Sequence, residues 1–186
     1  MENLITPYGS EVNTNLAPAR ELLRGSELHW YAAYTNARHE KYVASQLNDR
    51  GLDSFLPLYC SVRQWKDRRK EIVLPLFPGY VFVCLADNER VRVLQIPGVV
   101  RFVSFNGRPA PLDDDEIESL KRAMVAGVVA EPHPYLKIGR RVRIKRGPLA
   151  GMEGILARKK DKFRVVISLD LIMRSVATEV EVSDLE

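Results

Sequence analysis

The sequence lacks the features that mark membrane and secreted proteins. Among its 186 residues the longest apolar run lies around residues 81–85, far short of the about 20 residues that cross a bilayer as a helix. The first 27 residues contain no basic start followed by an apolar core and a small-residue cleavage site. We therefore expect a soluble, cytoplasmic protein that does not bind a membrane.

Residues for metal binding and catalysis are also scarce. Cys60 and Cys84 have no CxxC spacing and the three histidines are scattered, so we expect reduced, structural thiols and no zinc site. The sequence contains no motif for nucleophilic catalysis and no phosphate-binding glycine loop. The acidic run at residues 113–115 fits a helix N-terminus better than paired catalytic carboxylates. The sequence thus predicts a binding protein rather than an enzyme, with no cofactor.

Positive charge is concentrated in the C-terminal part of the chain. Residues 1–135 hold 16 Lys and Arg against 17 Asp and Glu, a net charge of −1. Residues 136–186 hold 12 against 7, a net charge of +5. This asymmetry favours a polyanionic partner, and a basic solvated face is the alternative.

The order of periodic segments predicts an α+β domain with an antiparallel sheet over residues 28–126, preceded by a flexible leader of residues 1–27. Asn36 can cap a helix that Gly51 ends, and Asp113 can cap another that Gly127 ends. We expect helices at residues 37–50, at 87–95 and after residue 113, and strands near residues 30–36, 54–58, 80–85 and 99–105.

The C-terminal part alternates with a period of two. In RRVRIKRG, Val142 and Ile144 face one way while Arg141, Arg143 and Lys145 face the other. Several such short strands within about 50 residues predict a small all-β barrel over residues 136–186. Residues 127–135 contain two prolines and no period, so we expect a linker there.

The stretch LPLFPGYVFVCL, residues 74–85, is apolar on both faces of its expected strand. Tyr80 and Phe82 point to one face, and Val81 and Val83 to the other. Two interpretations stay open: a central strand buried on both sides, or an aromatic face that joins Tyr34 and receives a partner.

The stretch RQWKDRRK, residues 63–70, is expected to be a basic hairpin. Its cations can bind phosphates and its tryptophan can stack on an unpaired base, or the tip is merely solvated with the tryptophan folded onto the core. The candidate nucleic-acid-binding residues are Arg63, Trp65, Lys66, Arg68, Arg69 and Lys70.

Taken in order, several stretches resemble one known family. WYAAYTNARHEKYVASQL, LPLFPGYVFV, IPGVVRFV and RPAPLDDDEIESL resemble the N-terminal (NGN) domain of NusG-type transcription elongation factors. KIGRRVRIKRGPLAGMEGIL resembles the KOW motif that begins their C-terminal barrel. WKDRRKEIVLPLFPGY and LIMRSVATEVEV look closer to the specialised paralogues RfaH and UpxY than to housekeeping NusG.

The resemblance implies a monomeric factor that acts on transcription. Its NGN domain would bind the clamp helices of the largest RNA polymerase subunit and suppress pausing or termination at a specific operon, such as a polysaccharide cluster. The basic hairpin would contact non-template DNA, and the KOW domain would contact a small-subunit ribosomal protein or Rho. The clamp-binding residues would be Tyr34, Phe77, Pro78, Tyr80 and Phe82, and the KOW partner-binding residues Ile172, Met173 and Arg174.

Some positions depart from RfaH, and other classes stay open. Residues 89–92 read Glu-Arg-Val-Arg where RfaH has a His-Thr-Thr anchor. RfaH can refold its KOW domain into helices, but residues 165–167 and 176–180 favour strands here. The alternatives are a housekeeping NusG-like factor, a KOW-type ribosome-binding or RNA-binding protein whose aromatic face is core, and an enzyme with a closed polar pocket.

Overall fold

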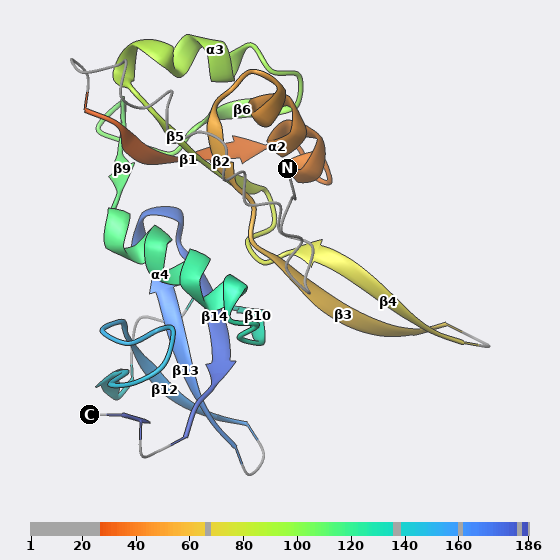
Figure 1. Ribbon diagram of the computed structural model, residues 1–186, viewed down its shortest axis with the longest axis vertical. Coiled ribbons are helices and arrows are strands. Elements are labelled where there is room, and N and C mark those ends of the chain that lie inside the picture. Colours follow the sequence, from red (N-terminus) through yellow and green to blue (C-terminus); the bar gives the residue numbers. More distant parts are fainter. Residues whose placement is uncertain (1–26, 66–67, 136–138, 160–161, 182–183, 186) are drawn as a thin grey trace. The chain divides into compact units, whose positions relative to one another are not determined.

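The computed structural model describes residues 27–65, 68–135, 139–159, 162–181 and 184–185 (Figure 1). Contacts divide these residues into two compact units. The first holds the described residues up to Leu56 together with Pro78–Asp114, and the second holds Pro57–Phe77 together with the described residues from Asp115 onward. No helix in the described part of the chain has the length and apolarity that a membrane crossing requires.

The first unit is built on an antiparallel sheet. Its strand order is β2-β5-β1-β6, and β9 also pairs with β1. The mixed α+β architecture with antiparallel pairing is the one that the sequence predicts. The strands are β1 (His29–Thr35), β2 (Asp53–Phe55), β5 (Tyr80–Leu85), β6 (Val99–Phe102) and β9 (Pro111–Leu112).

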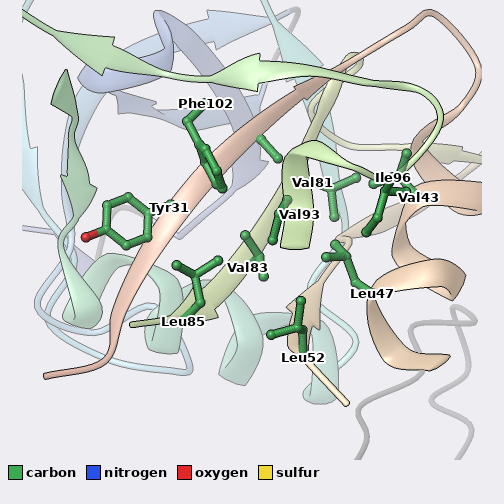
Figure 2. Close-up of a cluster of buried hydrophobic side chains, with 11 residues drawn as sticks. Tyr31, Val43, Leu47, Leu52, Val81, Val83, Leu85, Val93, Ile96 and Phe102 are labelled. Carbon is green, nitrogen blue, oxygen red and sulfur yellow. The ribbon is translucent and has the colours of Figure 1, made fainter. Parts of the chain in front are cut away.

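One face of this sheet carries the core of the unit (Figure 2). Alternate residues of β1 and β5 enter it, because successive side chains of a strand point to opposite faces. Helices α2 (Glu40–Asp49) and α3 (Arg90–Leu94) contribute the residues that pack against them. Burying each such aliphatic side chain stabilises the fold by about 1.5–3 kcal/mol. The cluster includes Tyr31, Val43, Leu47, Val81, Val83, Leu85, Val93, Ile96 and Phe102.

Helix α2 begins three residues later than the sequence predicts. The Asn36 N–H donates to the Gly98 carbonyl, and Arg38 has a left-handed φ of 64°. Residues 36–39 therefore form a turn, and His39 occupies the N-cap position without a side-chain hydrogen bond. The predicted helix end is confirmed, because Gly51 follows the helix with a φ of 71°.

The other N-terminal segments are shorter than expected. The helix predicted at residues 87–95 is a 3₁₀ turn, η3 (Asp87–Glu89), followed by α3. The strand predicted at 99–105 divides into β6 and β7 (Ser104–Phe105), and β7 forms a hairpin with β8 (Arg108–Pro109). Asn106 and Gly107 turn this hairpin with φ values of 51° and 78°, which are typical of a type I′ turn.

The second unit contains a long hairpin, a helix and a second sheet (Figure 1). The hairpin strands are β3 (Leu58–Trp65) and β4 (Arg68–Pro75), and the helix is α4 (Asp114–Val125). The antiparallel sheet has the order β10-β14-β13-β12-β11. Its strands are β10 (Ala130–His133), β11 (Arg141–Arg143), β12 (Glu153–Lys159), β13 (Lys162–Leu169) and β14 (Arg174–Glu179), with η4 (Asp170–Ile172) between the last two.

The C-terminal sheet can be compared with two sequence predictions, the strands at residues 165–167 and 176–180 and the linker at residues 127–135. The prediction of strands rather than helices is confirmed: β13 covers residues 165–167, and β14 covers residues 176–179 of the predicted 176–180. Residues 130–133, expected in a linker, instead form β10 and pair with β14. Pro132 has no N–H to donate, but β10 is an edge strand, where proline is tolerated. The sheet thus starts before residue 136.

Candidate functional site

The pairing of β1 with β5 brings two of the predicted site residues together. Tyr34 lies opposite Tyr80 in the register, and their ring centroids are 5.4 Å apart at an interplanar angle of 57°. Both side chains are half-buried. The sequence left this contact conditional on the pairing of the two strands, and the strands do pair.

Two other predicted site residues lie in the interior. Phe82 is 0% exposed and Phe77 is 2% exposed. The Phe82 ring stacks on Phe55 of the neighbouring strand, with 6.1 Å between centroids. Apart from Tyr80, every residue of β5 is buried, so the strand is apolar on both faces because both faces are covered over most of its length. The accessible part of the predicted site is Tyr34, Pro78 and Tyr80.

Arg101 of β6 adds a cation to this aromatic surface. It lies opposite Tyr34 in the register, and its guanidinium carbon is 5.3 Å from the centroid of the Tyr34 ring. This geometry is that of a cation–π contact, and the arginine side chain stays exposed. Sequence reasoning missed Arg101 because only the long-range pairing of β1 with β6 brings it to Tyr34. The available signal was a single arginine within the apolar strand VVRFV.

The turn before β5 is fixed by a buried carboxylate. Glu40 Oε1 accepts the Gly79 N–H at 2.8 Å, and the Gly79 carbonyl accepts the Thr35 N–H at 2.9 Å. Gly79 has a φ of 85°, and a Cβ there would lie 3.3 Å from Cε2 of Tyr34. Glycine is therefore favoured here for two reasons: it adopts the left-handed backbone conformation without strain, and its missing Cβ lets the Tyr34 ring approach closely. Glu40 was also missed, although an acidic residue beside the apolar stripe of a helix is a usable signal.

The β3–β4 hairpin sorts the predicted basic residues onto two faces. Arg63 pairs with Lys70, and Gln64 pairs with Arg69. Paired residues share a face and the period along a strand is two, so Arg68 lies on the side of Lys70 and Arg69 on the other. All four cationic side chains are exposed. Trp65 pairs with Arg68 through its backbone; its side chain and all of Lys66 lie outside the described residues.

The predicted KOW site lies at the turn between β13 and β14. Ile172 is 4% exposed and thus belongs to the interior, whereas Met173 is 62% exposed with a left-handed φ of 49°. Arg174 is exposed and begins β14. Tyr135 O–H donates to Asp170 Oδ1 at 3.0 Å beside this turn. Of the three predicted residues, Met173 and Arg174 are accessible to a partner.

Comparisons with known proteins agree on one family. The sequence model described as "Transcription termination factor nusG" matches residues 28–121, more than half of the chain. This chain belongs to the NusG family.

Relatives and a solved structure agree with that assignment. Transcription termination/antitermination protein NusG of Staphylococcus carnosus is 30% identical over 173 residues, covering 84% of this chain and 94% of that protein. The protein of the same name from Staphylococcus aureus (strain Mu50) is 31% identical with the same coverage. The structure titled "Domain interaction in Thermotoga maritima NusG" has a TM-score of 0.53 at 23% identity, covering 86% of this chain and 97% of that one. The chain is accordingly a NusG-type transcription factor.

The segment at the RfaH anchor position uses its charges within the chain. Arg92 forms an ion pair with Glu89 at 2.5 Å and donates to the Arg50 carbonyl at 2.8 Å. Arg50 in turn donates to the Arg92 carbonyl at 2.7 Å. These contacts join the end of α2 to α3. They occupy the charged groups of the segment that the sequence analysis compared with the His-Thr-Thr anchor of RfaH.

A polar cluster closes the other end of the NusG-family core. Tyr31 O–H donates to Asp87 Oδ1 at 2.7 Å and accepts from Arg90 Nη2 at 3.0 Å. The Arg90 guanidinium also lies 5.0 Å from the Tyr31 ring centroid. Burial raises the pKa of Tyr31, the hydrogen bond to Asp87 raises it further, and Arg90 opposes both effects. The cluster satisfies the hydroxyl of a core tyrosine.

Proposed function

We propose that this chain is a specialised elongation and antitermination factor, of the RfaH and UpxY kind. In this proposal it binds the clamp helices of the largest RNA polymerase subunit and suppresses pausing or termination at a specific operon, such as a polysaccharide cluster. It acts by binding and not by catalysis. The observation that carries the proposal is the accessible Tyr34–Tyr80 pair at the edge of an otherwise buried strand.

The chemistry of this surface supports a protein partner. Tyrosine and arginine are, with tryptophan, the residue types enriched among those that dominate the energy of protein interfaces. The rings of Tyr34 and Tyr80 pack against each other, and the Arg101 guanidinium lies against the Tyr34 ring. Side chains that are ordered before binding lose less conformational entropy when the partner arrives. We assign the direct contacts to Tyr34, Pro78 and Tyr80, and a supporting interior role to Phe77 and Phe82.

The proposed mechanism is a population shift in the polymerase. A factor that binds the closed clamp more tightly than the open, paused clamp changes the ratio of the two states by its differential affinity. A preference of about 1.4 kcal/mol changes that ratio about tenfold. The factor needs no catalytic group for this effect, because the polymerase supplies the chemistry.

The remaining partners belong to the second unit. We propose that Arg63, Arg68, Arg69 and Lys70 contact the phosphates of the non-template DNA strand, because all four cations are exposed. Met173 and Arg174 are proposed to contact a small-subunit ribosomal protein or Rho. Ile172 supports their turn from the interior. We further propose that residues 28–126 carry the polymerase-binding surface together with the DNA-binding hairpin, and that residues 136–186 recruit the other partner.

The test uses the full chain and purified RNA polymerase. A Tyr34→Ala, Tyr80→Ala double variant should bind at least about 30-fold more weakly, because each truncated interface tyrosine costs about 1–2 kcal/mol or more. Tyr42→Ala, which removes an exposed tyrosine from α2, is the matched control and should bind as the unmodified chain does. Phe82 is unsuitable for this test because Phe82→Ala would leave a cavity in the interior and destabilise the fold.

Pause lifetimes on transcribed templates complete the test. The unmodified chain should shorten pauses on a template that carries its target sequence, and the double variant should not. Equal binding by the double variant and the unmodified chain would refute the assigned surface. Pause shortening on every template would replace the specialised factor with the housekeeping alternative. A chain that ignores polymerase and binds RNA would favour the RNA-binding alternative.

A further inference from the structure

The sheet of the second unit begins with a strand in the segment that was expected to be a linker. Strand β10 pairs with β14 from Ala130, opposite Thr178, to His133, opposite Ser175 (Figure 1). β10 is the first strand in the sheet order, so β14 is its one neighbouring strand there. Residues 129–135, which we call the strap, therefore cover the edge that β14 would otherwise present to solvent.

Two side-chain contacts attach the start and the middle of the strap. Thr178 Oγ1 donates to the Val129 carbonyl at 3.1 Å. Arg164 of β13 donates from Nη2 to Glu131 Oε2 at 2.9 Å. Arg164 is 8% exposed, and a buried guanidinium needs an acceptor to balance its charge. The carboxylate of the strap is thus matched to a buried cation of the sheet.

The end of the strap is connected to the turn that carries Met173. Tyr135 O–H donates to Asp170 Oδ1 at 3.0 Å, and the Asp170 carbonyl accepts the Met173 N–H at 3.2 Å. Asp170 therefore links the strap to an exposed residue of the proposed partner-binding turn. His133 lies opposite Ser175, two residues after Met173. The docked strap borders this turn along β14.

Backbone pairing holds the strap less firmly than it holds the rest of the sheet. β10 has four residues in register with β14, whereas β13 has six in register with β14 and five with β12. Pro132 has no N–H to donate, and Val129, Pro132 and Pro134 are exposed. An edge strand with few backbone hydrogen bonds opens at a lower free energy than the interior of its sheet.

The prolines keep a released strap close to its docked conformation. Glu131 and His133 each precede a proline, and a residue in that position is restricted to extended conformations. A strap that stays extended loses little conformational entropy when it pairs again with β14. Release and docking are therefore a reversible equilibrium.

We propose that the strap is autoinhibitory: docked, it closes the edge of β14 beside Met173, and released, it opens that edge to an extended segment carrying a carboxylate. An open strand edge accepts such a segment by backbone pairing, and Arg164 favours a segment with a carboxylate at the position of Glu131. The strap is independent of polymerase binding. Only its effect on the second partner rests on the proposed function, through the contacts assigned to Met173 and Arg174.

Hydrogen exchange of the full chain, followed by NMR, tests the equilibrium. The amides of β10 and those of β14 that bond to it should exchange as one group, at least about tenfold faster than the amides that join β12 to β13. The test variant, Glu131→Gln with Tyr135→Phe, weakens two anchors and leaves β14 unaltered. Exchange of this group should become about tenfold faster, while the amides between β12 and β13 keep their rates.

The matched control is Glu118→Gln with Tyr42→Phe. It removes the carboxylate of an ion pair within α4 and the hydroxyl of an exposed tyrosine in α2. These are the same chemical changes at positions outside the strap. Exchange in the control should match that of the unmodified chain.

A fluorescent peptide with the sequence VVAEPHPY, residues 128–135, tests whether the open edge accepts a strand. Apparent affinity is reduced by the fraction of molecules that are open. The test variant should therefore bind the peptide about tenfold more tightly than the unmodified chain, the same factor as the change in exchange. A second peptide with the Glu131→Gln change should bind more weakly to both proteins, because it offers Arg164 no charge.

Four results would overturn the proposal. Strap amides that exchange no faster than those between β12 and β13 would show that β10 is a permanent strand. The test variant could behave as the unmodified chain does in both assays, or the control could change as much as the test variant. Equal binding of the two peptides would show that Arg164 does not select a carboxylate. Neither assay contains polymerase, so failure here is distinct from failure of the proposed function.

Discussion

Replacing Glu40 by alanine removes the carboxylate that holds the turn before β5. The Glu40 side chain is buried and accepts the Gly79 N–H at 2.8 Å. Gly79 lies against the Tyr34 ring and directly precedes Tyr80, the first residue of β5. The substitution therefore tests whether one buried hydrogen bond supports both the fold and the proposed polymerase-binding surface.

The expected loss follows from the kind of hydrogen bond. Bonds to a charged group contribute about 1.5–3 kcal/mol, roughly twice the value of neutral ones. Glu40→Ala leaves the Gly79 N–H without its acceptor, so we expect a loss of about 2 kcal/mol in the free energy of unfolding of the first unit. Glu40→Gln keeps a neutral carbonyl acceptor of the same reach, and we expect a loss of about 1 kcal/mol.

Urea unfolding followed by Trp30 fluorescence measures this loss. The sequence has two tryptophans, Trp30 and Trp65. Trp30 is 3% exposed in β1 of the first unit, so a Trp65→Phe background makes the signal specific for that unit. Polymerase affinity of the same proteins, measured well below the unfolding transition, should fall for Glu40→Ala and change less for Glu40→Gln.

Two outcomes would refute this reasoning. Glu40→Gln and Glu40→Ala could lower the free energy of unfolding by the same amount, which would show that the carbonyl acceptor kept by glutamine contributes nothing. Alternatively, Glu40→Ala could be destabilising while its folded form binds polymerase as tightly as the unmodified chain. In that case the turn stabilises the fold but does not position Tyr80.

Three further predictions concern other contacts. Because the pKa of Tyr31 is raised on folding, its contribution to stability is complete below its unfolded-state value of about 10 and is lost as the pH rises through the folded-state value. Tyr31→Phe should lower the free energy of unfolding by about 1 kcal/mol at neutral pH, and it should reduce the decrease in stability that the unmodified chain shows at alkaline pH. If the urea midpoints of the variant depend on pH as those of the unmodified chain do, this prediction is wrong. Phe82→Ala should cost about 3–5 kcal/mol, because the side chain is fully buried, and a loss below about 1 kcal/mol in the same urea assay would mean that Phe82 is solvent-facing. Gly154→Ala should destabilise the C-terminal sheet by about 1–3 kcal/mol or more, since the new Cβ would lie 2.8 Å from the Val166 carbonyl oxygen; a thermal unfolding curve that matches the unmodified chain would contradict that clash.

Some features of the site follow from local patterns. The alternation of β5 places Tyr80 and Phe82 on one face whatever surrounds the strand, because the side-chain period of a strand is two. The hairpin of basic residues follows from the polar composition of residues 63–70. The strand character of residues 165–167 follows from their β-branched side chains, and the structure confirms it.

Other features depend on contacts between distant segments. The sequence placed Phe82 and Ile172 among the partner-binding residues, yet both are buried, because exposure is set by what packs against a residue and not by its type. The start of α2 moved because Asn36 bonds to Gly98, some sixty positions along the chain. Strand β10 exists only because β14 offers it an edge to pair with.

The sequence by itself determined the family, the strand periods, the turn glycines and the sign of the charge on each segment, because each of these is written in neighbouring residues. The tertiary structure alone decided that Tyr34 meets Tyr80 and Arg101, and that Glu40 holds Gly79. It also decided which aromatic residues stay accessible. The reason is physical: backbone geometry fixes a side chain's direction locally, but burial and pairing depend on segments brought together only when the chain has folded.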